Sequence, residues 1–137
     1  MIDWEQVVIM MKDIEQYSFD LERMNLSSKK ELEEKEKYYA LSMVLFAIIN
    51  RSIDIANEVV MGSHLPIPGS YRDMFDLLAK NKFLSKQTAS QMNNLVMYRN
   101  MIAHQYHSFD AEHLWQVKRF SLCVKPFIEE IKKLAKK

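Results

Sequence analysis

Apolar residues recur along most of this chain at intervals of three and four positions, a spacing that gathers them on one face of a helix. The pattern predicts helices over residues 2–24, 29–61 and 86–105, a short helix after Ser70, and a last helix after Asp110. The later part of the second segment is apolar on most sides, which is typical of the central helix of a bundle. The expected fold is therefore all-α: an up-and-down four-helix bundle with an additional short helix.

Residues that break or cap helices separate these segments. The stretch 25–28 supplies a break and an N-cap, and the loop 62–69 contains two prolines, each of which disfavours helical geometry in the residue before it. Ser70, Ser85 and Asp110 are further N-cap candidates. Pro126 predicts a kink in the last helix, because its ring removes a helix hydrogen bond. The charged run KKELEEKEK, which opens the second helix, is expected to face solvent.

Composition narrows the class of protein. A chain of 137 residues that is 48% hydrophobic is expected to form one compact domain over residues 1–137, and 2 glycines with 3 prolines argue against a many-stranded sheet protein. The longest charge-free run, 38–50, has 13 residues and is shorter than the roughly 20 that span a membrane. Since the opening residues do not resemble a secretory signal and one cysteine cannot form an internal disulfide, we expect a cytoplasmic protein without membrane contact.

Charge is distributed unevenly along the chain. Residues 1–61 carry 12 acidic and 7 basic side chains, a net −5, whereas residues 62–137 carry 6 acidic and 12 basic, a net +6. A polyanion would favour surfaces that the second half builds. Alternatively, the two halves neutralise each other within the fold or across a dimer.

The candidate chemistry lies in one polar stretch within the 86–105 segment and just beyond it. Arg99, Asn100, His104 and Tyr106 place a permanent cation, an amide, an imidazole and a phenol within eight positions. On one helix Asn100 and His104 share a face, but Arg99 and His104 are five residues apart and diverge by about 140°. They meet on one ligand only if the helix ends near Ala103 or if a second subunit supplies the complement, which favours a symmetric dimer.

This set of groups suits phosphodiester cleavage in RNA without a metal. His104 would take the proton from the ribose 2′-hydroxyl or deliver one to the leaving oxygen, and Arg99 would hold the phosphate and stabilise its added charge. Asn100 would orient the imidazole or the phosphate, and Tyr106 would stack on a base or donate to the phosphate. From spacing alone, the same residues also fit a surface or capping role at a helix end.

The string RNMIAHQY fits the pattern R-N-x-x-A-H-x-Y and resembles the HEPN superfamily, specifically the HepT-like toxins of toxin–antitoxin pairs. RSIDIANEVV and IPGSYRDMFDLLAKNKFL look like features of the same family, so the likeness spans most of the chain. The resemblance implies a single HEPN-like helical domain that acts as a homodimeric, metal-independent endoribonuclease without a cofactor, in a type VII-like pair. It implies that Arg99 and His104 are catalytic, that Asn100 supports them, and that a nucleotidyltransferase antitoxin neutralises the toxin by transferring AMP to Tyr106.

Two alternatives stay open. One is that the domain is a non-catalytic nucleotide- or protein-binding module that partners a nucleotidyltransferase. A metal site is a rival use of the three-residue repeat formed by His104, His107, Asp110 and His113, although such a series drifts around a helix. Other residues are expected to serve packing: Cys123 in the core, and Tyr38 and Tyr39 against neighbouring helices, while Met97 and Met101 are candidates for an adaptable interface.

Overall fold

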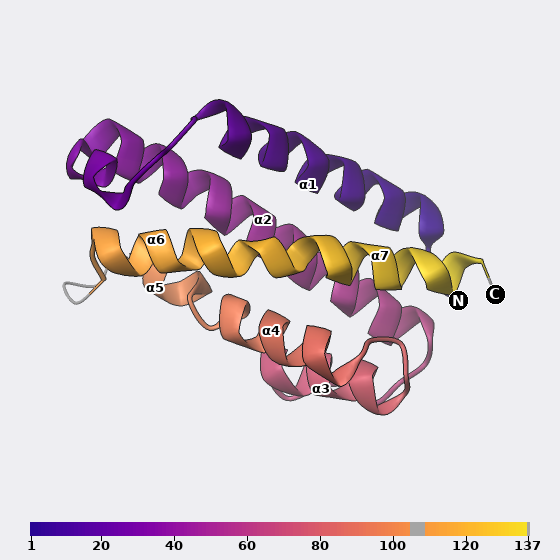
Figure 1. Ribbon diagram of the computed structural model, residues 1–137. Coiled ribbons are helices and arrows are strands. Elements are labelled where there is room, and N and C mark those ends of the chain that lie inside the picture. The colour runs from indigo at the N-terminus through magenta and orange to yellow at the C-terminus, as the bar shows by residue number, and fades with distance from the viewer. Residues whose placement is uncertain (105–108, 137) are drawn as a thin grey trace.

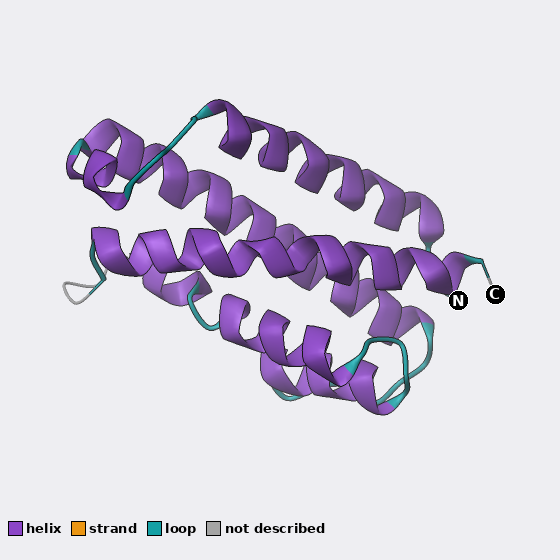
Figure 2. Cartoon of the chain, viewed as in Figure 1, coloured by secondary structure: helices purple, strands orange, loops and turns teal. Residues whose placement is uncertain are grey.

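The computed structural model describes residues 1–104 and 109–136, and every regular element in this part of the chain is helical (Figures 1 and 2). The elements are α1 (Trp4–Arg23), the 3-10 helix η1 (Lys29–Glu33), α2 (Lys35–Gly62), α3 (Tyr71–Lys80), α4 (Lys86–Val96), α5 (Arg99–His104), α6 (Ala111–Phe120), the 3-10 turn η2 (Ser121–Cys123) and α7 (Val124–Ala135). The prediction of an all-α bundle is confirmed.

Helix α2 is the central element. It packs against α1 on one side and against α3, α4, α5 and α6 on its other sides. Helices α6, η2 and α7 follow one another as a single rod along the bundle (Figure 1). By length and mean hydropathy α2 would pass for a membrane-spanning helix, but half of its most apolar window is buried inside the fold. The apolar character of α2 is thus explained by its place in the core. Its buried residues are Leu41, Ser42, Leu45, Ile48, Ile49, Ser52, Ile53, Ile55, Ala56, Val59 and Val60.

The second predicted helix begins later than its hydrophobic pattern indicates. Residues 29–33 form a 3-10 helix, and Glu34 is extended before α2 starts. The cause is local: backbone N–H groups of Ser27 and Ser28 donate to the Glu31 carboxylate, which tightens this turn and lowers the Glu31 pKa to about 2. The expectation that the whole charged run faces solvent is wrong for Leu32, which is buried.

The fourth predicted helix is interrupted. Instead of one helix over 86–105, α4 ends at Val96 and α5 begins at Arg99 after a turn. Residue Tyr98 in this turn packs its ring on those of Phe109 and Phe120, with centroids 6.3 and 5.9 Å away. These contacts come from distant parts of the chain, which explains why local periodicity does not reveal the break.

The last helix departs from α geometry slightly before the predicted kink. Residues 121–123 adopt 3-10 geometry, and Pro126 lies in the first turn of α7. A proline at this position has no N–H to offer the carbonyl of Leu122, four residues earlier, so the disturbance falls upstream of the ring. The N-caps predicted at Ser70, Ser85 and Asp110 are confirmed, each side chain accepting an N–H three residues later at 3.1 Å.

The end of α2 makes a close contact that can be tested. A Cβ added to Gly62 would stand 2.5 Å from Cα and 2.7 Å from N of Ile2, and the adjacent Asp3 N–H is held by the Glu58 carboxylate at 2.9 Å. Gly62→Ala should therefore lower the free energy of unfolding by about 1–3 kcal/mol, measured by urea titration of the helical circular dichroism. The control is Gly69→Ala, whose Cβ would meet only the flexible Asp73 carboxylate at 3.1 Å; it should change stability by about 0.5 kcal/mol or less. Equal stability of both variants would contradict this packing.

Candidate functional site

The Arg99 guanidinium is held in a fixed orientation at the start of α5. Its Nε donates to Oδ1 of Asn50 on α2 at 2.5 Å, and its Nη1 donates to Oδ1 of Asn100 at 3.0 Å. The guanidinium carbon lies 5.4 Å from the centre of the Phe46 ring and 5.8 Å from that of Tyr71. Two amide oxygens and two aromatic rings, drawn from α2, α3 and α5, therefore fix the plane of this cation.

The charge of Arg99 is not neutralised by its neighbours in the described part of the chain, where it forms no ion pair with a carboxylate. Amide oxygens orient a guanidinium but leave its full positive charge, so the group remains able to bind an anion. The side chain is half-buried, which strengthens such an interaction relative to one in open water. This is the arrangement expected of a phosphate-binding arginine.

Asn50, which accepts the shortest hydrogen bond from Arg99, is not among the residues predicted from the sequence. Asn50 lies at the end of an apolar run on α2, forty-nine positions before Arg99. A signal was present: Tyr39, Met43, Phe46 and Asn50 are spaced i, i+4, i+7 and i+11 and so lie on one face of α2. An amide at the end of an otherwise apolar face points to a polar partner from elsewhere in the fold.

The same face of α2 carries apolar side chains that stay exposed in the part of the chain that the structure describes. Met43 is 75% exposed and Tyr39 is 56% exposed, so the expectation that Tyr39 is buried against neighbouring helices is wrong. Met97, which precedes Arg99 by two residues, is 60% exposed. Tyr71, which contacts Arg99, is also exposed. We call Tyr39, Met43, Phe46, Tyr71 and Met97 the α2 apolar surface; it borders Arg99, since Phe46 and Tyr71 contact the guanidinium.

The chain is anchored again just after the motif. The Tyr38 hydroxyl donates to the Phe109 carbonyl at 3.3 Å, and the Phe109 side chain is buried. Asp110 then caps α6: hydrogen bonds from the backbone and ring N–H of His113 lower the pKa of its carboxyl. Phe109 and Asp110 are therefore attached to the bundle.

The predicted site residues have different outcomes. Arg99 and Asn100 are brought together by a hydrogen bond. His104 is the last residue of α5, so the helix ends one residue after Ala103, as one of the two predicted arrangements requires. In ideal helix geometry the positions of Arg99 and His104 lie about 140° apart around the axis. The His104 side chain and the whole of Tyr106 lie outside what the structure describes, so their roles remain predictions.

Two members of the predicted metal set, the His104 side chain and His107, lie outside what the structure describes. Of the other members, Asp110 is engaged by His113, with its Oδ1 2.7 Å from the ring Nδ1. Within residues 1–104 and 109–136, no group of three or more His, Cys, Asp or Glu side chains is arranged to hold a metal ion. Cys123 is buried with its Sγ 3.5 Å from Sδ of Met92, and burial raises its pKa to about 11, which confirms its assignment to the core.

An all-α bundle with Arg99 and Asn100 opening a short helix that ends at His104 defines a HEPN-type helical protein. The model of the ribonuclease HepT-like family matches residues 11–134, and the chain belongs to this family.

Two relatives are similar in sequence to parts of the chain. YutE of Bacillus subtilis is 26% identical over 94 residues, which cover 68% of this chain and 65% of YutE. HepT of Shewanella oneidensis, named an mRNA nuclease, is 35% identical over 60 residues, which cover 44% of this chain and 45% of HepT. The matched regions thus span less than two thirds of either relative.

Solved structures share the fold. YutE, described as a cytosolic protein of unknown function, superposes with a TM-score of 0.82 at 20% identity, over 97% of this chain and 90% of YutE. A toxin–antitoxin complex of HepT and MntA gives 0.68 at 21% identity, over 87% of this chain and 97% of that one. A tri-AMPylated HEPN toxin of Shewanella oneidensis, in complex with an MNT antitoxin, gives 0.51 at 24% identity, over 87% and 90%.

Proposed function

We propose that this protein is a metal-independent endoribonuclease toxin of a type VII-like toxin–antitoxin pair, acting in the cytoplasm as a homodimer of single HEPN-like domains. The observation that carries the proposal is the oriented, unneutralised Arg99 guanidinium beside the exposed α2 apolar surface. Family membership supports it, as does the mRNA nuclease name of the HepT relative.

The geometry of α5 supports the proposed dimer. Arg99 and His104 diverge around one helix, so a single chain does not readily present both to one phosphate. A two-fold axis that passes near α5 would bring a second motif opposite the first and would bury the α2 apolar surface of both copies. The proposed cleft is therefore composite, with guanidinium and imidazole groups contributed by two chains.

The proposed reaction is transesterification within RNA. His104 removes the proton of a 2′-hydroxyl, whose oxygen attacks the adjacent phosphorus. The bond from phosphorus to the 5′-oxygen breaks, and the protonated His104 gives its proton to that oxygen. Arg99 binds the phosphate and stabilises the extra negative charge of the transition state. Asn100 keeps the guanidinium in place. The products are a 2′,3′-cyclic phosphate and a 5′-hydroxyl, so DNA is not a substrate.

His104→Ala should abolish cleavage, because removal of a general acid–base is expected to cost about 10² to 10⁴ in rate in each proton transfer it serves. The assay incubates purified protein with total RNA in EDTA and detects 2′,3′-cyclic phosphate ends. Circular dichroism should remain that of the helical bundle. Undiminished cleavage by the variant would contradict the catalytic role, and a wild type that leaves no cyclic phosphate would favour the alternative function, a non-catalytic nucleotide- or protein-binding module that partners a nucleotidyltransferase.

Met43→Glu should dissociate the dimer, because it places a charge at the centre of the α2 apolar surface without touching the core. Light scattering should give a mass near the 16.3 kDa of one chain in place of twice that value, and RNA cleavage should fall with it. The matched control is Leu122→Glu, since Leu122 is 78% exposed but lines a groove between α1 and α7. If only Leu122→Glu dissociates the dimer, the interface lies at the groove between α1 and α7, and the proposed interface on the α2 apolar surface is wrong.

The proposed antitoxin is a nucleotidyltransferase that transfers AMP to the Tyr106 hydroxyl. The added phosphate would be held near Arg99, where it would compete with an RNA phosphate by charge and by bulk. The AMPylated Shewanella oneidensis toxin supports this proposal through a protein of the same fold.

Mass spectrometry after coexpression with a cognate nucleotidyltransferase should detect AMP on the peptide that contains Tyr106. Tyr106→Phe should remove the modification and leave the protein toxic in the presence of the antitoxin. Two exposed tyrosines serve as internal controls: Tyr71, which contacts Arg99, and Tyr39 on the α2 apolar surface. AMP on either of them, with Tyr106 unmodified, would contradict the assignment.

A further inference from the structure

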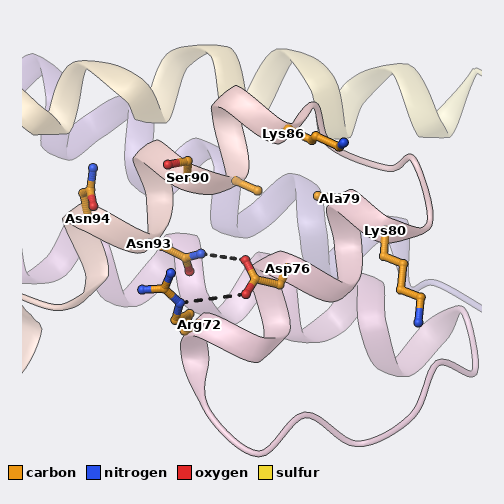
Figure 3. A pocket seen from close by; sticks show the side chains of 9 residues that line it. Arg72, Asp76, Ala79, Lys80, Lys86, Ser90, Asn93 and Asn94 are labelled. Atoms are coloured by element: carbon orange, nitrogen blue, oxygen red, sulfur yellow. Dashed lines mark hydrogen bonds and ion pairs between the residues drawn. The ribbon is translucent and has the colours of Figure 1, made fainter.

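A polar hollow of about 410 Å³ lies between α3 and α4, outside the motif (Figure 3). Its walls carry Arg72, Asp76 and Lys80 from α3, and Lys86, Ser90 and Asn94 from α4. Because three of these side chains are cations and one is an anion, the hollow carries an excess of two positive charges. It belongs to the basic half of the sequence.

Most of this positive charge is available to a ligand. The only carboxylate on the walls, that of Asp76, accepts a hydrogen bond from Asn93 at 2.9 Å and lies 3.9 Å from Nε of Arg72, whose side chain is 80% exposed. A pair this long and this exposed is weak, so Arg72 keeps its capacity to bind an anion. Lys80 and Lys86 form no ion pair with any residue that the structure describes.

The hollow also carries neutral hydrogen-bond donors. The Ser90 hydroxyl and the Asn94 amide have no hydrogen-bond partner in the described part of the chain, and both stand on the α4 wall (Figure 3). Cations interspersed with uncharged donors suit the oxygens of a phosphodiester chain, in which charges alternate with sugar oxygens and hydroxyls. A purely ionic partner would make less use of the amide and hydroxyl.

One end of the hollow leads to the proposed cleft. Arg72 and Asn94 lie at the end where α3 begins and α4 finishes, whereas Lys80 and Lys86 lie at the far end (Figure 3). Tyr71, immediately before Arg72, contacts the Arg99 guanidinium. Arg72 and Lys80 are eight helical residues apart, which corresponds to about 12 Å, the length of about three to four stacked nucleotides.

We propose that the α3–α4 hollow is the path of the RNA strand outside the scissile linkage, with Lys80, Lys86 and Arg72 on successive backbone phosphates. The proposal rests on the proposed ribonuclease function and adds the place and polarity of substrate binding. It makes affinity depend on RNA length and on salt rather than on base identity, because backbone contacts carry no sequence information.

The test measures binding in a protein that does not cleave. In the His104→Ala background, Lys80→Ala/Lys86→Ala is compared with Lys132→Ala/Lys133→Ala, which removes the same charge from α7. Fluorescence anisotropy with a labelled 12-nucleotide single-stranded RNA is recorded over a series of salt concentrations. The hollow variant should bind about tenfold more weakly, and the slope of log affinity against log salt should fall by about 1.4, since each lost phosphate contact on a single strand removes about 0.7. The α7 variant should bind like its parent.

Equal affinity and equal salt slope of the two double variants would overturn the proposal, even if the wild type cleaves RNA. The two proposals can fail separately. If the wild type does not cleave RNA but the hollow variant still binds RNA more weakly than its parent, the proposed catalysis is refuted and the binding path stands. Labelled poly-glutamate provides the last arm. If the hollow variant loses poly-glutamate binding and keeps RNA binding, the hollow is a site for an acidic protein and the proposal is wrong.

Discussion

The orientation of one guanidinium determines what this bundle can do. Arg99 stands at the start of a six-residue helix, where a long side chain would ordinarily sample many rotamers. Amide oxygens from Asn50 and Asn100 and the rings of Phe46 and Tyr71 reduce that freedom without supplying a negative charge. The entropy of ordering the side chain is thus lost during folding, before any anion binds, which favours affinity for a phosphate.

Helix α2 links this site to the core. One face of α2 is buried among α1, α3, α5 and α6 and stabilises the fold, while the adjoining face carries Phe46 and Asn50 to Arg99 and leaves Met43 exposed. A single central helix therefore holds the bundle together, orients the cation and supplies the surface on which a second copy is proposed to pack. Substitutions on the exposed face are expected to affect assembly before they affect stability.

Local sequence rules predict much of the fold because its helices are amphipathic and their ends carry ordinary caps at Ser70, Ser85 and Asp110. They fail where contacts between residues that are far apart in the sequence determine the local structure. The break between α4 and α5 depends on the Tyr98 ring packing on Phe109 and Phe120, and Asn50 meets Arg99 across forty-nine positions. Arg99 and Asn100 are recognisable from the motif, but the residues that orient them are not, since periodicity does not report contacts between helices.

The most direct measurement of the central claim is complementation between two inactive variants. Arg99→Ala and His104→Ala chains are mixed, unfolded and refolded together, so that mixed dimers form. If Arg99 of one chain acts with His104 of the other, each mixed dimer contains one intact site, so each should cleave RNA at about half of the wild-type rate. Because equal mixing makes about half of the dimers mixed, the whole sample should recover about a quarter of the wild-type rate. If the mixed dimers form but remain as inactive as either parent, both groups act from the same chain and the composite site is wrong.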